Sequence, residues 1–191
     1  MKGRLALAAL VAGVLAAGCA GPAADPVPSS TFRDSGFAAC PEPVSGARTA
    51  DSLSSTALQC MDGSGRSVSL DRPVGTPTVV NLWATWCAPC AEELPAFQRL
   101  HADAGDQLVV LGVVTDSAAA QSVAAAKDLH LSFANVYDRE SAVLKGLRRA
   151  SLPVTAFVGA DGSIRHVYTG PALTDTALRD LVREHLGVVV R

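Results

Sequence analysis

Two cysteines separated by two residues, Cys87 and Cys90, are the side chains of this sequence best suited to covalent chemistry. They follow the apolar, β-branched segment 78–83, which predicts a strand, and they precede a segment with helical spacing that starts at Pro89. A thiol at the start of a helix lies beside unpaired backbone N–H groups and the positive end of the helix dipole, which favour the thiolate. The thiolate is the species that attacks a disulfide.

The spacing gives the two sulfurs different roles. One helical turn places the sulfur of Cys90 close enough to attack a mixed disulfide formed by Cys87. Pro89 suits the first turn, because its missing N–H would have had no partner there. We therefore predict that Cys87 is the nucleophile and that Cys90 is the resolving thiol, which releases the substrate.

The same pair could instead be half of a zinc site or an inert structural disulfide. Zinc needs two further ligands, and the four histidines are scattered without paired spacing. The tryptophan before the pair, the strand pattern and the proline-bearing helix favour redox chemistry. We predict no metal and no cofactor, and the inert disulfide remains as the alternative.

The segment 79–95 (VVNLWATWCAPCAEELP) resembles, nearly residue for residue, the TlpA/ResA-like extracytoplasmic thiol-disulfide oxidoreductases of the thioredoxin superfamily. The resemblance extends more loosely over 58–186. It implies an α/β, thioredoxin-like fold with a central mixed β-sheet flanked by helices, a TlpA-type insertion and an N-terminal hairpin extension. It also makes Trp86, next to the first cysteine, a candidate for substrate binding.

Glu93 is the candidate proton acceptor. Thioredoxins resemble one another in having a buried Asp six residues before the nucleophile, but this chain has Asn81 there, which cannot act as a base. Glu93 lies three residues after Cys90, so a helix places both on one face, and TlpA/ResA-like proteins are similar in having Glu there. A carboxylate partly withdrawn from water could accept the Cys90 proton during resolution. The alternative is a solvated surface charge.

A proline loop is expected to complete the site. The segment 151–155 (SLPVT) resembles the cis-proline loop that faces the dithiol in this superfamily, and a cis bond costs least at proline. Pro153 removes one N–H near the sulfurs, and the backbone around Leu152 could pair with an extended substrate peptide. The alternative is a trans proline at the start of an edge strand.

Two further cysteines, Cys40 and Cys60, lie outside the motif and outside the family pattern. In an oxidising compartment, four thiols allow three pairings. A bond between these two would close a loop of about 20 residues and contribute on the order of 3 kcal/mol if unstrained. We predict this structural disulfide, which would clamp the N-terminal segment to the first hairpin. A second dithiol that relays electrons to the first is the alternative.

The first residues predict export from the cytoplasm. Two basic residues, Lys2 and Arg4, precede an unbroken apolar run over 5–17, a pattern typical of a secretory signal. The run has 13 residues, fewer than the roughly 20 that a membrane-spanning helix needs.

The signal ends in LAAGC, which resembles a bacterial lipobox, although Ala16 stands where the strict pattern has Leu. We predict a lipoprotein-type signal peptide at 1–18 and a lipid anchor on Cys19, with ordinary cleavage and secretion as the alternative. The proline-containing stretch 19–36 predicts a flexible tether, and 37–191 the thioredoxin-like domain.

Strand patterns and helical patterns alternate around the motif, as in an α/β sheet. Asp116 or Ser117 is expected to cap the Ala-rich helix that ends near Leu129. We expect strands at 59–61, 68–70, 78–83, 108–114, 133–136, 155–158 and 164–168, and further helices at 89–104, at 141–147 and after 174.

Composition excludes several functions. The chain has 16 basic and 18 acidic side chains, and without residues 1–18 it would keep 14 and 18, a formal charge of -4. Binding of nucleic acid, or of anionic lipid by bulk charge, is therefore not supported. With 49% hydrophobic residues the chain is too apolar to be disordered. A Gly-rich phosphate loop and a Ser-His-Asp order are also missing from the sequence.

We therefore expect an enzyme at the extracytoplasmic face of the cytoplasmic membrane that acts on protein thiols and disulfides. The resemblance implies a reductant, for example of apocytochrome c in cytochrome c maturation, that is re-reduced by a membrane electron donor. The alternatives are an oxidase that donates its disulfide to exported proteins and a redox-inactive interaction module. A peroxidase is disfavoured, because Ala84 stands where a Thr would be expected.

Overall fold

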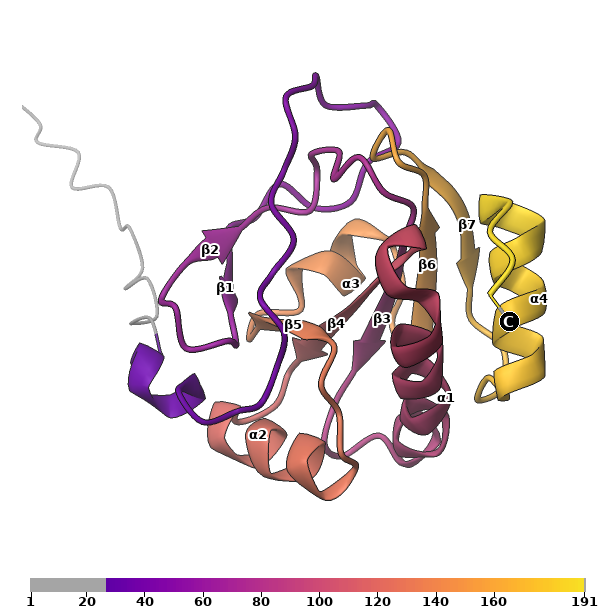
Figure 1. Ribbon diagram of the computed structural model, residues 1–191. Helices are drawn as coiled ribbons and strands as arrows, with labels where there is room; N and C mark the ends of the chain where they lie inside the picture. The colour runs from indigo at the N-terminus through magenta and orange to yellow at the C-terminus, as the bar shows by residue number, and fades with distance from the viewer. Residues whose placement is uncertain (1–26, 191) are drawn as a thin grey trace, which may run out of the picture.

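The computed structural model describes residues 27–190, and Figure 1 shows a mixed sheet with helices packed against it. The predicted signal peptide at 1–18 and Cys19 lie outside the described residues. Within 27–190, no helix combines the length and the apolar composition that crossing a bilayer requires.

Seven strands form the sheet in the order β2-β1-β5-β4-β3-β6-β7. The neighbours β3, β4 and β5 run parallel, and the outer strands pair antiparallel. All six residues of β3 are buried, because both faces of the sheet are covered. The strands are β1 (Leu58–Cys60), β2 (Ser67–Val68), β3 (Thr78–Trp83), β4 (Val109–Thr115), β5 (Ala134–Asp138), β6 (Val154–Val158) and β7 (Ile164–Tyr168).

The helices lie on both faces of the sheet (Figure 1). Phe97 of α1, Val123 of α2 and Leu178 of α4 belong to one core cluster, whereas Val143 of α3 belongs to the cluster on the opposite face. The helices are α1 (Ala88–Ala104), α2 (Ala119–Asp128), α3 (Ala142–Gly146) and α4 (Asp175–Leu186), with two 3-10 turns, η1 (Ser29–Phe32) and η2 (Gly105–Gln107).

The expected α/β arrangement of a mixed sheet flanked by helices is confirmed. β3 has the expected bounds, and α1 follows it after the expected short turn. The N-terminal hairpin of β1 and β2 extends the sheet, because β1 also pairs with β5. β5 and α3 lie between α2 and β6, and they correspond to the strand expected at 133–136 and the helix expected at 141–147.

The cap expected for α2 is wrong. Its N-cap residue is Ala118, whose side chain makes no capping hydrogen bond. Asp116 adopts a positive φ of 46°, and the Oγ of Ser117 accepts a hydrogen bond from the backbone N of Thr85 at 3.0 Å. Ser117 therefore holds the loop that leads to the dithiol instead of the start of the helix.

Residues that pack against the domain begin before residue 37, where the domain was expected to start. Phe32, at the end of η1, is buried in the same core cluster as α1. Ser35 is also buried, and its Oγ donates a hydrogen bond to the carbonyl oxygen of Met61 at 2.7 Å. Within 27–36, the described part of the expected tether, these contacts differ from a flexible chain. The sequence did not indicate them, because one aromatic ring in a proline-containing stretch gives no periodic signal of burial.

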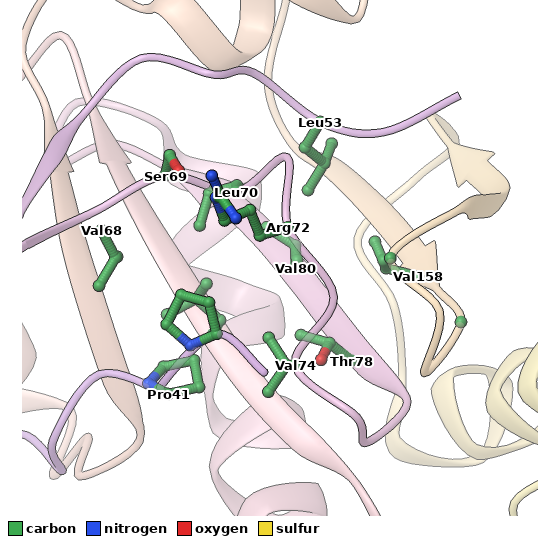
Figure 2. Close-up of a pocket in the computed structure, with 14 residues that line it drawn as sticks. Pro41, Leu53, Val68, Ser69, Leu70, Arg72, Val74, Thr78, Val80 and Val158 are labelled. Carbon is green, nitrogen blue, oxygen red and sulfur yellow. The ribbon is translucent and has the colours of Figure 1, made fainter. Parts of the chain in front are cut away.

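The stretches of chain before β1 and after β2 pack on the sheet face that α3 covers. Leu53 from the stretch before β1 and Val80 from β3 belong to the same core cluster. Figure 2 shows the small apolar cavity that remains, with Leu53 and Val74 facing Val80 and Val158 of the sheet.

A disulfide joins Cys40, in the stretch before β1, to Cys60 of β1, with 6.0 Å between the Cα atoms and a sequence separation of 20. We expect the double variant Cys40→Ser/Cys60→Ser to lose about 3 kcal/mol of unfolding free energy, because its unfolded chain is no longer closed into a loop. Urea unfolding without reductant measures the loss. The control is Cys87→Ser/Cys90→Ser, whose loop has a separation of only 3. Equal midpoints for wild type and the Cys40/Cys60 variant would contradict this prediction.

Candidate active site

Cys87 is the N-cap residue of α1, directly after the turn that follows β3. Its backbone is extended (φ -91°, ψ 95°), and its Sγ accepts a hydrogen bond from the backbone N of Cys90 at 3.3 Å. Pro89 occupies the first turn of the helix, as the sequence predicts. The sulfur of Cys87 therefore lies where unpaired N–H groups stabilise negative charge.

The two cysteines form a disulfide and differ in exposure. Their Cα atoms are 5.3 Å apart. Cys87 keeps 5% of its surface exposed, whereas Cys90 is 0% exposed. A substrate disulfide can therefore approach Cys87, while Cys90 lies behind it in the core.

The predicted proline loop lies at the same edge of the sheet as the dithiol. The Leu152–Pro153 peptide bond is cis. Val154, the next residue, is paired with Leu82 near the end of β3. Leu152 and Pro153 are both half-buried, so part of their surface remains open to a bound peptide.

Trp86 is the most exposed large apolar side chain of the described residues, at 60%. Its Nε1 donates a hydrogen bond to the carbonyl oxygen of Asp116 at 2.8 Å. Ser117 ties the same two loops together, since its Oγ accepts a hydrogen bond from the backbone N of Thr85 and donates one to the carbonyl oxygen of Thr115 at 3.1 Å, at the end of β4. The loop after β4 thus fixes the tryptophan beside Cys87, a role of Asp116 and Ser117 that the sequence did not indicate.

Glu93 is buried, with 1% of its surface exposed. Its Oε1 accepts a hydrogen bond from Nδ2 of Asn81 at 2.7 Å, and its Oε2 accepts one from the backbone N of Leu173 at 3.0 Å. Burial raises the pKa of the Glu93 carboxyl, and these two hydrogen bonds only partly oppose that effect. Of the two alternatives stated for Glu93, the solvated surface charge does not fit this environment.

Asn81 is the part of the site that the sequence did not identify as a partner of Glu93. Its Nδ2 also lies 3.4 Å from Oγ1 of Thr155, the residue opposite it on β6. Its Oδ1 is buried and has no hydrogen-bond partner among the described residues. If the amide turned over, Oδ1 could accept a hydrogen bond from a protonated Glu93, so this pair can hold the carboxyl group in either charge state.

The site therefore combines a sulfur that is slightly exposed, a fully buried partner sulfur, a buried carboxyl group on the same helix and two loops that frame the surface. Such an arrangement can attack a disulfide, accept one proton and close an internal disulfide.

Comparison with known proteins identifies a family. The family model described as AhpC/TSA family matches residues 50–167. The thioredoxin-like protein YneN of Bacillus subtilis is 32% identical over 114 residues, which are 56% of this chain and 64% of YneN. The thiol-disulfide oxidoreductase ResA of Geobacillus thermodenitrificans is 29% identical over 142 residues, which are 73% of this chain and 79% of ResA.

Solved structures support the fold. A secreted Mycobacterium tuberculosis disulfide oxidoreductase homologous to Escherichia coli DsbE has a TM-score of 0.58 at 20% identity, covering 68% of this chain and 96% of its own. A thiol:disulfide interchange protein DsbE from Chlorobium tepidum has a TM-score of 0.63 at 18% identity, covering 75% of this chain and 100% of its own. These likenesses confirm the expected thioredoxin-like fold.

Proposed function

The chain belongs to the AhpC/TSA family, and from this we propose that it is an extracytoplasmic thiol-disulfide oxidoreductase that acts on cysteines of proteins through Cys87 and Cys90. The observation that supports this most is the position of Cys87 at the N-terminus of α1, where it keeps slight exposure, with the fully buried Cys90 behind it.

The reaction starts from the reduced pair. The thiolate of Cys87 attacks one sulfur of a substrate disulfide, forms a mixed disulfide and releases the other substrate sulfur as a thiolate, which takes up a proton. Cys90 then passes its proton to the carboxylate of Glu93 and attacks the sulfur of Cys87. The second substrate sulfur leaves, the substrate has gained two electrons, and the pair ends as the internal disulfide.

Substrate contacts are assigned to the surface around Cys87. In this proposal the exposed ring of Trp86 packs on apolar side chains next to the substrate cysteine. The backbone around Leu152 pairs with the extended substrate chain, and Pro153 keeps one N–H away from the sulfurs.

We propose that the protein works as a reductant of exported proteins, for example in cytochrome c maturation, and that a membrane electron donor re-reduces it. A member of this superfamily is a strong oxidant when the reduced, dithiol form of its cysteine pair is stabilised. Here the helix N-terminus stabilises the thiolate of Cys87, but the buried ionisable group on the same helix is the carboxyl of Glu93, which does not add to that stabilisation. A lipid anchor at Cys19 would hold the enzyme outside the cytoplasmic membrane.

The reduction potential of the Cys87–Cys90 pair tests the direction. We expect a value near the roughly -270 mV of thioredoxin, measured by equilibration with a dithiothreitol series. A value near the roughly -120 mV of DsbA would reject the reductant and favour an oxidase that donates its disulfide.

A further inference from the structure

A short basic segment lies between α3 and the proline loop. Residues 145–149 have the sequence KGLRR, in which Lys145, Arg148 and Arg149 are exposed. None of the ion pairs formed within 27–190 involves these three side chains. The Nζ of Lys145 donates a hydrogen bond to the backbone carbonyl of Glu140 at 2.6 Å, which leaves its charge uncompensated.

Most other arginines of the described residues form ion pairs. Within residues 27–190, carboxylates pair with most of the arginines other than Arg148 and Arg149, and Arg33, Arg72 and Arg139 are the exceptions. Those pairs involve Arg48, Arg66, Arg99, Arg165, Arg179 and Arg183. Three cations within five residues, with no carboxylate among them, are therefore a local exception.

Arg148 stands at a backbone position that favours glycine. Its φ is 55°, in the left-handed region. The N–H of Arg148 donates to the carbonyl of Lys145 at 2.9 Å and the N–H of Arg149 to that of Leu144 at 3.1 Å, the hydrogen-bond pattern of a helix end that usually has Gly at this position. Glycine would make the same turn with less strain, so the backbone alone does not explain an arginine here.

The C-terminal end of the segment leads directly into the proline loop. Arg149 precedes Leu152 by three residues, which span at most about 11 Å. The Leu152–Pro153 bond is the cis bond of the loop, and Val154 pairs with β3 at the edge of the sheet where the dithiol lies.

We propose that Lys145, Arg148 and Arg149 form a docking surface for acidic residues of the substrate protein, close in sequence to the cysteine that is reduced. This inference rests on the proposed function, since it places the acidic residues beside a peptide held by the proline loop. The partner is a polypeptide rather than an anionic membrane, because the cations adjoin the substrate loop and the formal charge of the chain is negative.

Three peptides of equal length test the proposal, each with one disulfide and with Glu, Gln or Lys as its flanking residues. We expect the reduced protein to act fastest on the Glu peptide and slowest on the Lys peptide at about 10 mM salt, and the rates to converge at about 1 M, where charges are screened within roughly 3 Å. Arg148→Gln/Arg149→Gln should slow reduction of the Glu peptide by about two- to fivefold per charge removed and leave the Gln peptide unchanged.

The Arg148→Gly variant distinguishes the effect of the Arg148 side chain from the effect of its backbone conformation. It should slow reduction of the Glu peptide while the midpoint of thermal unfolding stays the same or rises, because glycine relaxes the turn. Loss of rate only together with a lower midpoint would overturn the proposal.

Arg33→Gln/Lys127→Gln is the matched control, since it removes the same charge from exposed positions beside η1 and at the end of α2. It should keep the preference for the Glu peptide. Equal rates on the Glu and Gln peptides, or an equal loss in this control, would overturn the docking surface and leave the proposed function intact. Failure to reduce any of the three peptides would instead refute the proposed function. Binding to anionic phospholipid vesicles that is lost in Arg148→Gln/Arg149→Gln, without a peptide preference, would assign the cations to a membrane and overturn the proposal.

Discussion

The Cys87→Ser variant is expected to reduce insulin no faster than the reductant does without protein, whereas wild type accelerates the reaction. The reason is that a hydroxyl at the N-terminus of α1 cannot form the mixed disulfide that starts the exchange. Turbidity of the released insulin chains measures the rate.

With the Cys90→Ser variant, the reaction should stop one step later, at the mixed disulfide. Its Cys87 can still attack the substrate, but no second sulfur resolves the mixed disulfide, so a covalent adduct accumulates that mass spectrometry detects. Cys40→Ser/Cys60→Ser is the control and should retain activity, because this disulfide packs in the core cluster on the opposite face of the sheet. Equal activity of wild type and Cys87→Ser would mean that the pair is redox-inactive and the protein an interaction module.

The Glu93→Gln variant is expected to resolve the mixed disulfide about 10²-fold more slowly, at the lower end of what a general base contributes. The first attack should keep its rate, since Cys87 is stabilised by the N-terminus of α1 and not by Glu93. Rapid quenching with an alkylating agent separates the two steps. Glu92→Gln is the matched control, because Glu92 is exposed on the same helix and should change neither step.

The pH dependence gives Glu93 a second signature. Only the carboxylate accepts a proton, and burial raises the pKa of this group, so resolution in wild type should speed up with pH above the range in which an ordinary Glu ionises. Glu93→Gln should lose this rise. If the rate of resolution rose equally with pH in wild type and in Glu93→Gln, Glu93 would have a purely structural role.

The free energy of unfolding should fall as the pH rises, whereas the rate of resolution increases. Because the pKa of Glu93 is higher in the folded than in the unfolded chain, its contribution is fully present below the unfolded pKa and is lost as the pH rises through the folded one. Wild type should therefore lose unfolding free energy over this window, and Glu93→Gln should lose less. The fold can accept the glutamine, since Oδ1 of Asn81, which has no partner within 27–190, can receive its amide hydrogen once the Asn81 amide turns over.

What the sequence determined by itself is local. The strand at 78–83, the turn and the helix start at Cys87 follow from apolar periodicity and one proline, and any helix that begins there brings Cys87 and Cys90 together. The contacts involved are three residues apart, so chain connectivity alone enforces them.

What only the tertiary structure decided depends on residues far apart in the chain. Glu93 is buried because Asn81 and Leu173 reach it from 12 and 80 residues away, whereas spacing on the helix left a solvated charge equally open. Ser117 holds the loop at Thr85 because β3 and β4 are neighbours in the sheet. Such contacts arise from the order and register of the strands, which no local pattern encodes, because each segment's apolar periodicity fixes its own conformation but not its neighbour.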